Sequence, residues 1–130
     1  IVEMIGNFLS IVDVISENQQ ALQTWIFEHS QKLLKRDLSV SYFDCTNYYF
    51  DIGAPDLDGC DENGNPTEIK YRKRGPEKNH RPDPIVQMGL LIDKNGIPVA
   101  YDLFPGNESE KVHMRPLINR VKADINDCRI

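Results

Sequence analysis

The chain has 130 residues, of which 40% are hydrophobic and 27% are charged, a composition typical of a globular protein large enough for one core. No apolar run approaches the roughly 20 residues of a membrane span, and no basic segment precedes the apolar start, which excludes a signal peptide. Three cysteines without a C-x-x-C pair exclude a zinc module and a disulfide framework, and the net charge of −5 argues against a uniformly basic nucleic-acid-binding chain.

Residues 1–37 are expected to form a helical segment, either two helices or one broken helix. Their apolar side chains follow the helical repeat: Ile1, Ile5, Phe8, Leu9, Val12, Ile15, Leu22, Trp25, Ile26, Leu33 and Leu34. Ser16 and Gln19 resemble a capping box, which predicts that a second helix begins there and runs to about Arg36.

The most strand-like run is SVSYFDCTNYYFD, residues 39–51, which is rich in β-branched and aromatic side chains. Asp44 is the exception within it. A carboxylate inside a sheet is costly unless a cation or several donors meet it, and a divalent metal ion is one such partner. Strand alternation puts Asp44 on one face with Tyr42, Thr46 and Tyr48. The alternative is a structural aspartate that is held by hydrogen bonds.

The rest of the chain predicts a mixed α/β fold. Residues 52–68 contain DLDGCDENGN, which fails the spacing of an EF-hand calcium loop, so an acidic hairpin loop is expected and calcium is the weaker alternative. Strands are expected at 85–92 and 97–104, joined by a DKNG turn. A helix over 109–125 and the start of another strand at 127–130 follow. This order predicts three antiparallel strands, a crossing helix and a fourth strand.

Residues 70–81 contain six basic residues against one acidic residue: Lys70, Arg72, Lys73, Arg74, Lys78 and Arg81. Such a patch can contact phosphates on an otherwise acidic protein, because electrostatic potential is felt at close range. For His80 and Arg81 this would mean contact with phosphate oxygens. The alternative is a solvated basic loop whose course is fixed by nearby prolines.

Four segments occur in the chain in this order: YFDCTNYYFD, YRKRGPEKNHRPDP, VQMGLLIDKNGIPVAYDLFPGN and the helix that begins at Ser109. Together, over residues 38–125, they resemble the DDE transposases of the IS4 superfamily, in particular its IS1634-like branch. The second piece matches the family pattern at Gly75, Lys78, Asn79, Arg81, Asp83 and Gln87, with Asn79 where the family often has Asp. The third piece matches the family's turn before a helix at Pro105, Gly106, Asn107 and Glu110.

The resemblance implies an RNase H-like core in which Asp44 is the first of three catalytic, metal-binding acids. In that family a second Asp and a later Glu complete a site for Mg²⁺ or Mn²⁺, which supports strand cleavage and strand transfer of an insertion sequence. No convincing counterpart of either acid is present here, so we expect this piece alone to be inactive and to hold no metal stably. The implied turn and structural-motif residues are Gly75, Asp83, Gly106, Asn107 and Glu110.

The resemblance also implies partners for a longer parent protein. These are transposon-end and target DNA and, as a further option, a second copy in a homodimer, but no membrane. The expected DNA contacts are Lys70, Arg72, Lys73, Arg74, Lys78, His80 and Arg81. A cytoplasmic, nucleoid-associated location in a bacterium or archaeon is implied, and the cysteine usage agrees with a reduced compartment.

The expected organisation is the helical segment 1–37 followed by a partial catalytic domain, residues 38–130. Because the chain begins at Ile1 rather than Met and ends on the apolar Ile130, we expect it to be cut from a longer protein. Two alternatives to a transposase fragment remain. One is a non-enzymatic DNA-binding or regulatory relic, and the other is a structural RNase H-like interaction module.

Overall fold

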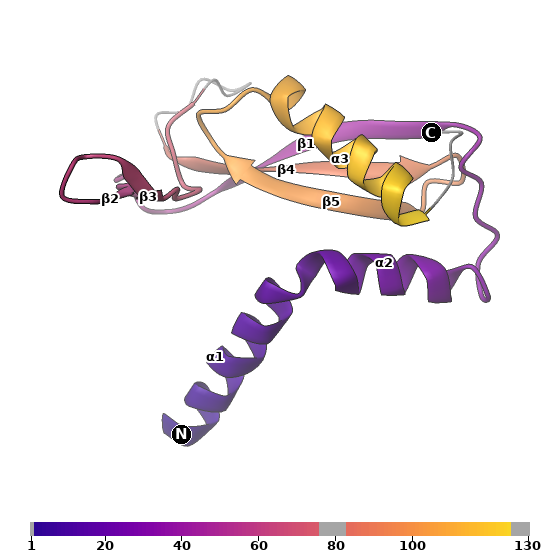
Figure 1. Ribbon diagram of the computed structural model, residues 1–130, viewed down its shortest axis with the longest axis horizontal. Coiled ribbons are helices and arrows are strands. Elements are labelled where there is room, and N and C mark those ends of the chain that lie inside the picture. The colour runs from indigo at the N-terminus through magenta and orange to yellow at the C-terminus, as the bar shows by residue number, and fades with distance from the viewer. Residues whose placement is uncertain (1, 76–82, 126–130) are drawn as a thin grey trace.

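The computed structural model describes residues 2–75 and 83–125 and has a mixed α/β architecture (Figure 1). The helices are α1 (Val2–Glu17), α2 (Gln19–Ser30) and α3 (Glu110–Ile125). The main sheet is antiparallel, in the order β1-β4-β5, and consists of β1 (Ser41–Tyr49), β4 (Ile85–Asp93) and β5 (Pro98–Pro105). A separate hairpin consists of β2 (Gly59–Cys60) and β3 (Pro66–Glu68). The predicted α/β class, with three antiparallel strands followed by a helix, is confirmed.

The helical segment at the start of the chain consists of two helices, as predicted, with a break at Asn18. The predicted capping box is wrong, because Ser16 lies within α1 and the residue before α2 is Asn18, whose side chain makes no capping hydrogen bond. α2 ends at Ser30, well before the predicted end at Arg36. The expected fourth strand at 127–130 lies outside the described residues.

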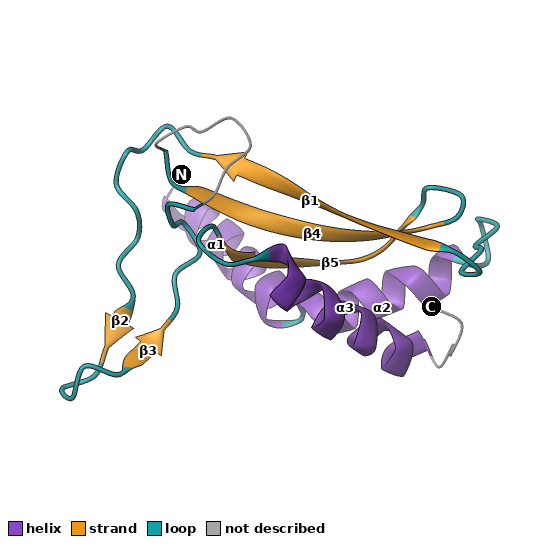
Figure 2. Ribbon diagram, turned by 90° about the horizontal axis from the view of Figure 1, so that it is seen from above, coloured by secondary structure: helices purple, strands orange, loops and turns teal. Residues whose placement is uncertain are grey.

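Helices α2 and α3 cover one face of the main sheet (Figure 2). The core between them consists of Phe27, Leu91, Val99, Ala100, Leu117 and Val121. Every second residue of β4, from Ile85 to Asp93, is buried on this side, and the residues between them are half-buried on the other side. No described helix covers that second face, which we call the open face.

α2 contacts the sheet through a residue outside its predicted apolar stripe. Phe27 is 2% exposed, whereas Trp25 and Ile26 in the stripe are 56% and 52% exposed. α1 runs away from the body of the protein beyond the break at Asn18 (Figure 1). Among the described helices, none is long and apolar enough to cross a lipid bilayer.

A buried aspartate fixes the turn between β4 and β5. Asp93 is 0% exposed, and its Oδ1 accepts hydrogen bonds from the backbone N–H groups of Asn95 (3.0 Å) and Ile97 (2.9 Å). Gly96 has a φ of 77°, a conformation that residues with a side chain rarely adopt. The predicted hairpin turn is therefore confirmed, with Asp93 stabilising it from the inside.

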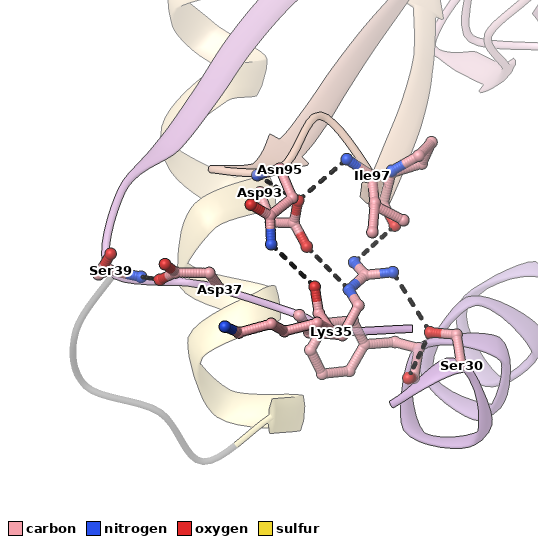
Figure 3. A network of polar contacts seen from close by, with 10 residues as sticks. Ser30, Lys35, Asp37, Ser39, Asp93, Asn95 and Ile97 are labelled. Atoms are coloured by element: carbon pink, nitrogen blue, oxygen red, sulfur yellow. Dashed lines mark hydrogen bonds and ion pairs between the residues drawn. The ribbon is translucent and has the colours of Figure 1, made fainter. Parts of the chain in front are cut away.

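Arg36 neutralises this buried carboxylate, and Figure 3 shows the network of polar contacts around Asp93. Its Nε lies 2.9 Å from Asp93 Oδ2, and its side chain is only 6% exposed. The guanidinium also donates hydrogen bonds to Ser30 Oγ (3.2 Å) and to the Pro98 carbonyl (2.7 Å), and it lies over the ring of Phe27. Burial lowers the pKa of Arg36, and the charge of Asp93 opposes this shift. The ion pair ties the end of α2 to the hairpin turn.

We expect Asp93→Asn to lower the free energy of unfolding by about 3 kcal/mol, because it keeps an acceptor in the turn but leaves Arg36 buried without a counter-charge. Urea unfolding followed by circular dichroism measures this loss. Lys94→Ala is the matched control, since Lys94 Nζ lies 3.7 Å from Asp37 in a pair that is largely open to solvent and whose loss should change stability by less than about 1 kcal/mol. Equal effects of the two substitutions would contradict a special role of the buried pair.

Candidate metal and nucleic-acid site

Asp44 lies in the middle of β1, opposite Leu90 of β4. The predicted alternation is confirmed, with exposed side chains at Tyr42, Asp44, Thr46 and Tyr48 and half-buried ones between them. The premise that Asp44 lies inside the sheet is wrong, because its exposure on the open face removes most of the desolvation cost. Among the described residues, the side chain of Asp44 has no hydrogen-bond or ion-pair partner. Its carboxylate is therefore available to a ligand that approaches the open face.

The described part of the chain does not assemble a complete metal site. Within residues 2–75 and 83–125, no three His, Cys, Asp or Glu side chains lie close enough together to hold a metal ion. Mg²⁺ requires near-octahedral oxygen ligands, and one carboxylate supplies only part of that set. A two-metal site at Asp44 therefore needs further acidic residues from outside the described ranges.

The basic segment lies beside the first residue of β4. Lys73 and Ile85 exchange backbone hydrogen bonds of 3.1 and 2.9 Å. Acidic residues of the preceding loop pair with its side chains: Arg72 Nη2 lies 2.5 Å from Asp56 Oδ1, and Lys73 Nζ lies 2.8 Å from Asp58 Oδ1. A DNA phosphate would have to compete with these two carboxylates for Arg72 and Lys73.

The two outer cations of the described basic segment differ in their partners. Lys70 pairs with Glu68, which is a third acidic residue of the segment between β1 and β4 that contains the β2–β3 hairpin. We call this segment the hairpin excursion. Arg74 is exposed, and its Nη2 donates a 2.6 Å hydrogen bond to the carbonyl of Gly53, which is uncharged. Because no acidic partner of Arg74 occurs among the described residues, an incoming phosphate would not have to displace a described carboxylate from this guanidinium.

The acidic loop is organised by hydrogen bonds within the hairpin. Asp61 accepts bonds from the side chain of Asn65 and from the backbone N–H groups of Asn65 and Asn63, which hold the pKa of Asp61 below its ordinary value. The side chain of Lys73 and the backbone N–H of Lys70 lower the pKa of Asp58 in the same way. The expected acidic hairpin is confirmed, and its described carboxylates form no calcium cage.

Two glycine backbones cross where the basic segment meets the turn after β5. A Cβ atom on Gly75 would lie 1.7 Å from the carbonyl oxygen of Gly106, and one on Gly106 would lie 2.3 Å from that of Ile85. The N–H of Gly106 donates a 3.0 Å hydrogen bond to the carbonyl of Tyr71. Only glycine allows this approach of main chains. The two motif glycines therefore meet at one point, which we call the glycine crossing.

Gln87 closes the glycine crossing from the covered face of the sheet. It is 7% exposed, and its Nε2 donates to the carbonyl oxygens of Glu108 (2.9 Å), Gly106 (3.1 Å) and Pro105 (3.3 Å). The amide has two hydrogens, so the three carbonyls share them. The sequence pattern includes Gln87 but does not indicate what it does. The signal that could have indicated a structural role is a polar residue at a position of β4 where alternation predicts a buried side chain.

The other motif residues lie near this crossing or outside the described ranges. Asn107 is exposed in the turn, and Glu110 is the exposed first residue of α3, where an acidic side chain suits the helix dipole. Asp83 is half-buried and precedes Pro84, which is buried. The remaining predicted site residues fall within 76–82, outside the described residues: Lys78, Asn79, His80 and Arg81.

A histidine that the sequence did not single out extends this network into α3. His113 Nε2 lies 2.6 Å from Glu108 Oε2, and its Nδ1 lies 3.9 Å from Asp102 Oδ2. Its ring stacks on Phe104, with centroids 4.1 Å apart. Because Gln87 binds the carbonyl of Glu108, one chain of contacts links β4, the turn and α3. His113 belongs to no recognisable spacing motif, so only the folded structure reveals it.

No family model matches the chain, and neither a curated protein nor a solved structure matches it. The resemblance to a transposase family therefore rests on the quoted motif residues of the sequence.

We expect Gly75→Ala to lower the free energy of unfolding by about 3 kcal/mol or more, because its Cβ has no space against the backbone of Gly106. Gly53→Ala is the control, because Gly53 also lies between β1 and β4 and a Cβ there would meet nothing within 4 Å. It should change the free energy of unfolding by less than about 0.5 kcal/mol. Urea unfolding of both variants measures the difference. A Gly75→Ala variant as stable as the parent chain would disprove the close backbone approach.

Proposed function

We propose that the chain is part of the catalytic domain of an IS4-superfamily DDE transposase and that Asp44 is its first metal-binding acid. One observation carries the proposal: the separate motif pieces converge. Gly75 and Gln87, which belong to the second motif pattern, and Gly106 at the end of the third piece close a single crossing at one end of the sheet. This convergence supports treating them as one ordered motif, on the same sheet as Asp44.

In the proposed reaction, a water molecule attacks the phosphodiester at a transposon end in line with the leaving 3′-oxygen. The released 3′-hydroxyl then attacks a phosphodiester of the target DNA and displaces one of its oxygens. Bound Mg²⁺ or Mn²⁺ would stabilise the attacking and leaving oxygens in both steps. Asp44 would contribute one carboxylate to this metal, and its exposure on the open face supports access by DNA.

The outer edge of β1 is a second support. In the described sheet β1 pairs only with β4, so no described strand lies along this outer edge. An RNase H-like core would fill this edge with a parallel strand after α3, since a parallel neighbour needs a crossover that a helix can supply. That strand would carry the second Asp beside Asp44, which agrees with the incomplete ligand set described above.

The basic segment is proposed as a phosphate contact at the end of the sheet where β1 ends and β4 begins. Arg74, exposed and without a described acidic partner, is the strongest of the described candidates. Arg72 and Lys73 would act only after exchanging Asp56 and Asp58 for phosphates.

We expect Mn²⁺ to broaden the amide NMR signals of Phe43 to Cys45 selectively at millimolar concentrations, because a single carboxylate binds the ion weakly. Asp44→Asn should remove this broadening. Asp51→Asn is the control, since it deletes an exposed carboxylate just beyond the same strand. If broadening at residues 43–45 persisted unchanged in the Asp44→Asn variant, the metal-binding role would be refuted, as a solely structural module predicts.

A further inference from the structure

The hairpin excursion brings an acidic segment alongside the described part of the basic segment. Residues 51–62, which we call the acidic arm, contain no Lys or Arg and five acidic residues: Asp51, Asp56, Asp58, Asp61 and Glu62. The N–H of Asp56 donates a 2.8 Å hydrogen bond to the carbonyl of Arg72, and Lys73 Nζ donates a 2.8 Å bond to the carbonyl of Asp56. Two oppositely charged segments are therefore held side by side by contacts that involve the main chain.

Two carboxylates of the acidic arm lie on the solvent side of the cations that they bind. Asp56 binds the guanidinium of Arg72, and its side chain is 33% exposed against 22% for the arginine. Asp58 binds the ammonium of Lys73, and its side chain is 38% exposed against 14% for the lysine. A polyanion that approaches from solvent would therefore meet these carboxylates before it meets the two cations.

These ion pairs are suited to exchange with phosphate. A pair whose carboxylate is about a third open to solvent adds little to stability, because water and salt screen it. Among the described contacts, Asp56 accepts from one nitrogen of the Arg72 guanidinium, whereas a phosphate commonly accepts from two. The β2–β3 hairpin beyond the arm projects away from the main sheet (Figure 2). Replacement of either carboxylate therefore requires no rearrangement of that sheet.

We propose that the acidic arm inhibits DNA binding from within the same chain. In the free protein Asp56 and Asp58 cover the two cations, and DNA phosphates must displace these carboxylates to reach them. A single anion can replace only one carboxylate, whereas successive phosphates of a duplex can replace both, so the arm favours duplex DNA over isolated anions. The inference rests on the proposed DNA contact of the basic segment and adds a means of regulating it.

Fluorescence anisotropy with a short DNA duplex of arbitrary sequence, on the full 130-residue chain, tests the proposal. The variant Asp56→Asn with Asp58→Asn should bind at least about tenfold more tightly than the parent chain, because it uncovers both cations. Its plot of log affinity against log salt should be steeper by up to about 2, since two more phosphates are neutralised. Asparagine at position 58 retains the oxygen that accepts the N–H of Lys70, so the arm should stay folded.

The matched control is Asp51→Asn with Glu62→Gln, which removes the same charge from the same arm. Within the described ranges neither residue forms an ion pair, so this variant should gain no more than about twofold in affinity, through long-range electrostatics alone. Adding Arg72→Ala and Lys73→Ala to the uncovered variant should remove the gain, because those two cations carry it.

The outcomes separate the inhibition from the DNA contact itself. Equal DNA affinity of the uncovered variant and the control would overturn the inhibition and leave the proposed DNA contact standing. A gain that persists without Arg72 and Lys73 would also overturn the inhibition, because it would then come from net charge alone. Absence of DNA binding in the parent chain and in every variant would overturn both the inhibition and the DNA contact of the basic segment.

Discussion

The contact between the backbones of Gly75 and Gly106 is the constraint on which the candidate site depends. It holds the end of the described basic segment against the turn that leads from β5 into α3. Gln87 adds its amide to the carbonyls of the same turn, and Lys73 pairs with the first residue of β4. A side chain at either glycine would separate these elements. The orientation of the basic segment and the start of α3 therefore depend on two residues that contribute no chemistry of their own.

Three of the polar residues in the main sheet, Asp93, Gln87 and Asp44, have different environments. Asp93 is buried against Arg36, so its charge is matched and fixes a turn. Gln87 is buried against backbone carbonyls, so it binds a turn without any charge. Asp44 alone is exposed on the open face and has no partner among the described residues. Two of the three are explained by the fold itself, and this difference is why a ligand role is proposed for Asp44.

The extent to which the sequence predicted this structure follows from the range of the interactions. The strand over Ser41–Tyr49 and the hairpin after Asp93 were predictable, since alternation and an Asn-Gly turn are local signals. The inward face of α2 was not, because packing against β5 and α3 selects Phe27 over the more apolar stripe. The pairing of Arg72 and Lys73 with Asp56 and Asp58 was likewise hidden, because it requires the hairpin excursion to fold back on itself.

The same limits apply to the site. The position and face of Asp44 could be predicted from alternation along a single strand, whereas its exposure could not, because that depends on which face the helices cover. The most direct test of the central claim is DNA nicking in Mg²⁺ by the proposed parent transposase, of which this chain would be a part, on a duplex carrying the ends of its element. Nicking by the parent protein and none by a folded Asp44→Asn variant is the predicted result. Equal nicking by both proteins would contradict the assignment of Asp44 as a metal-binding catalytic acid.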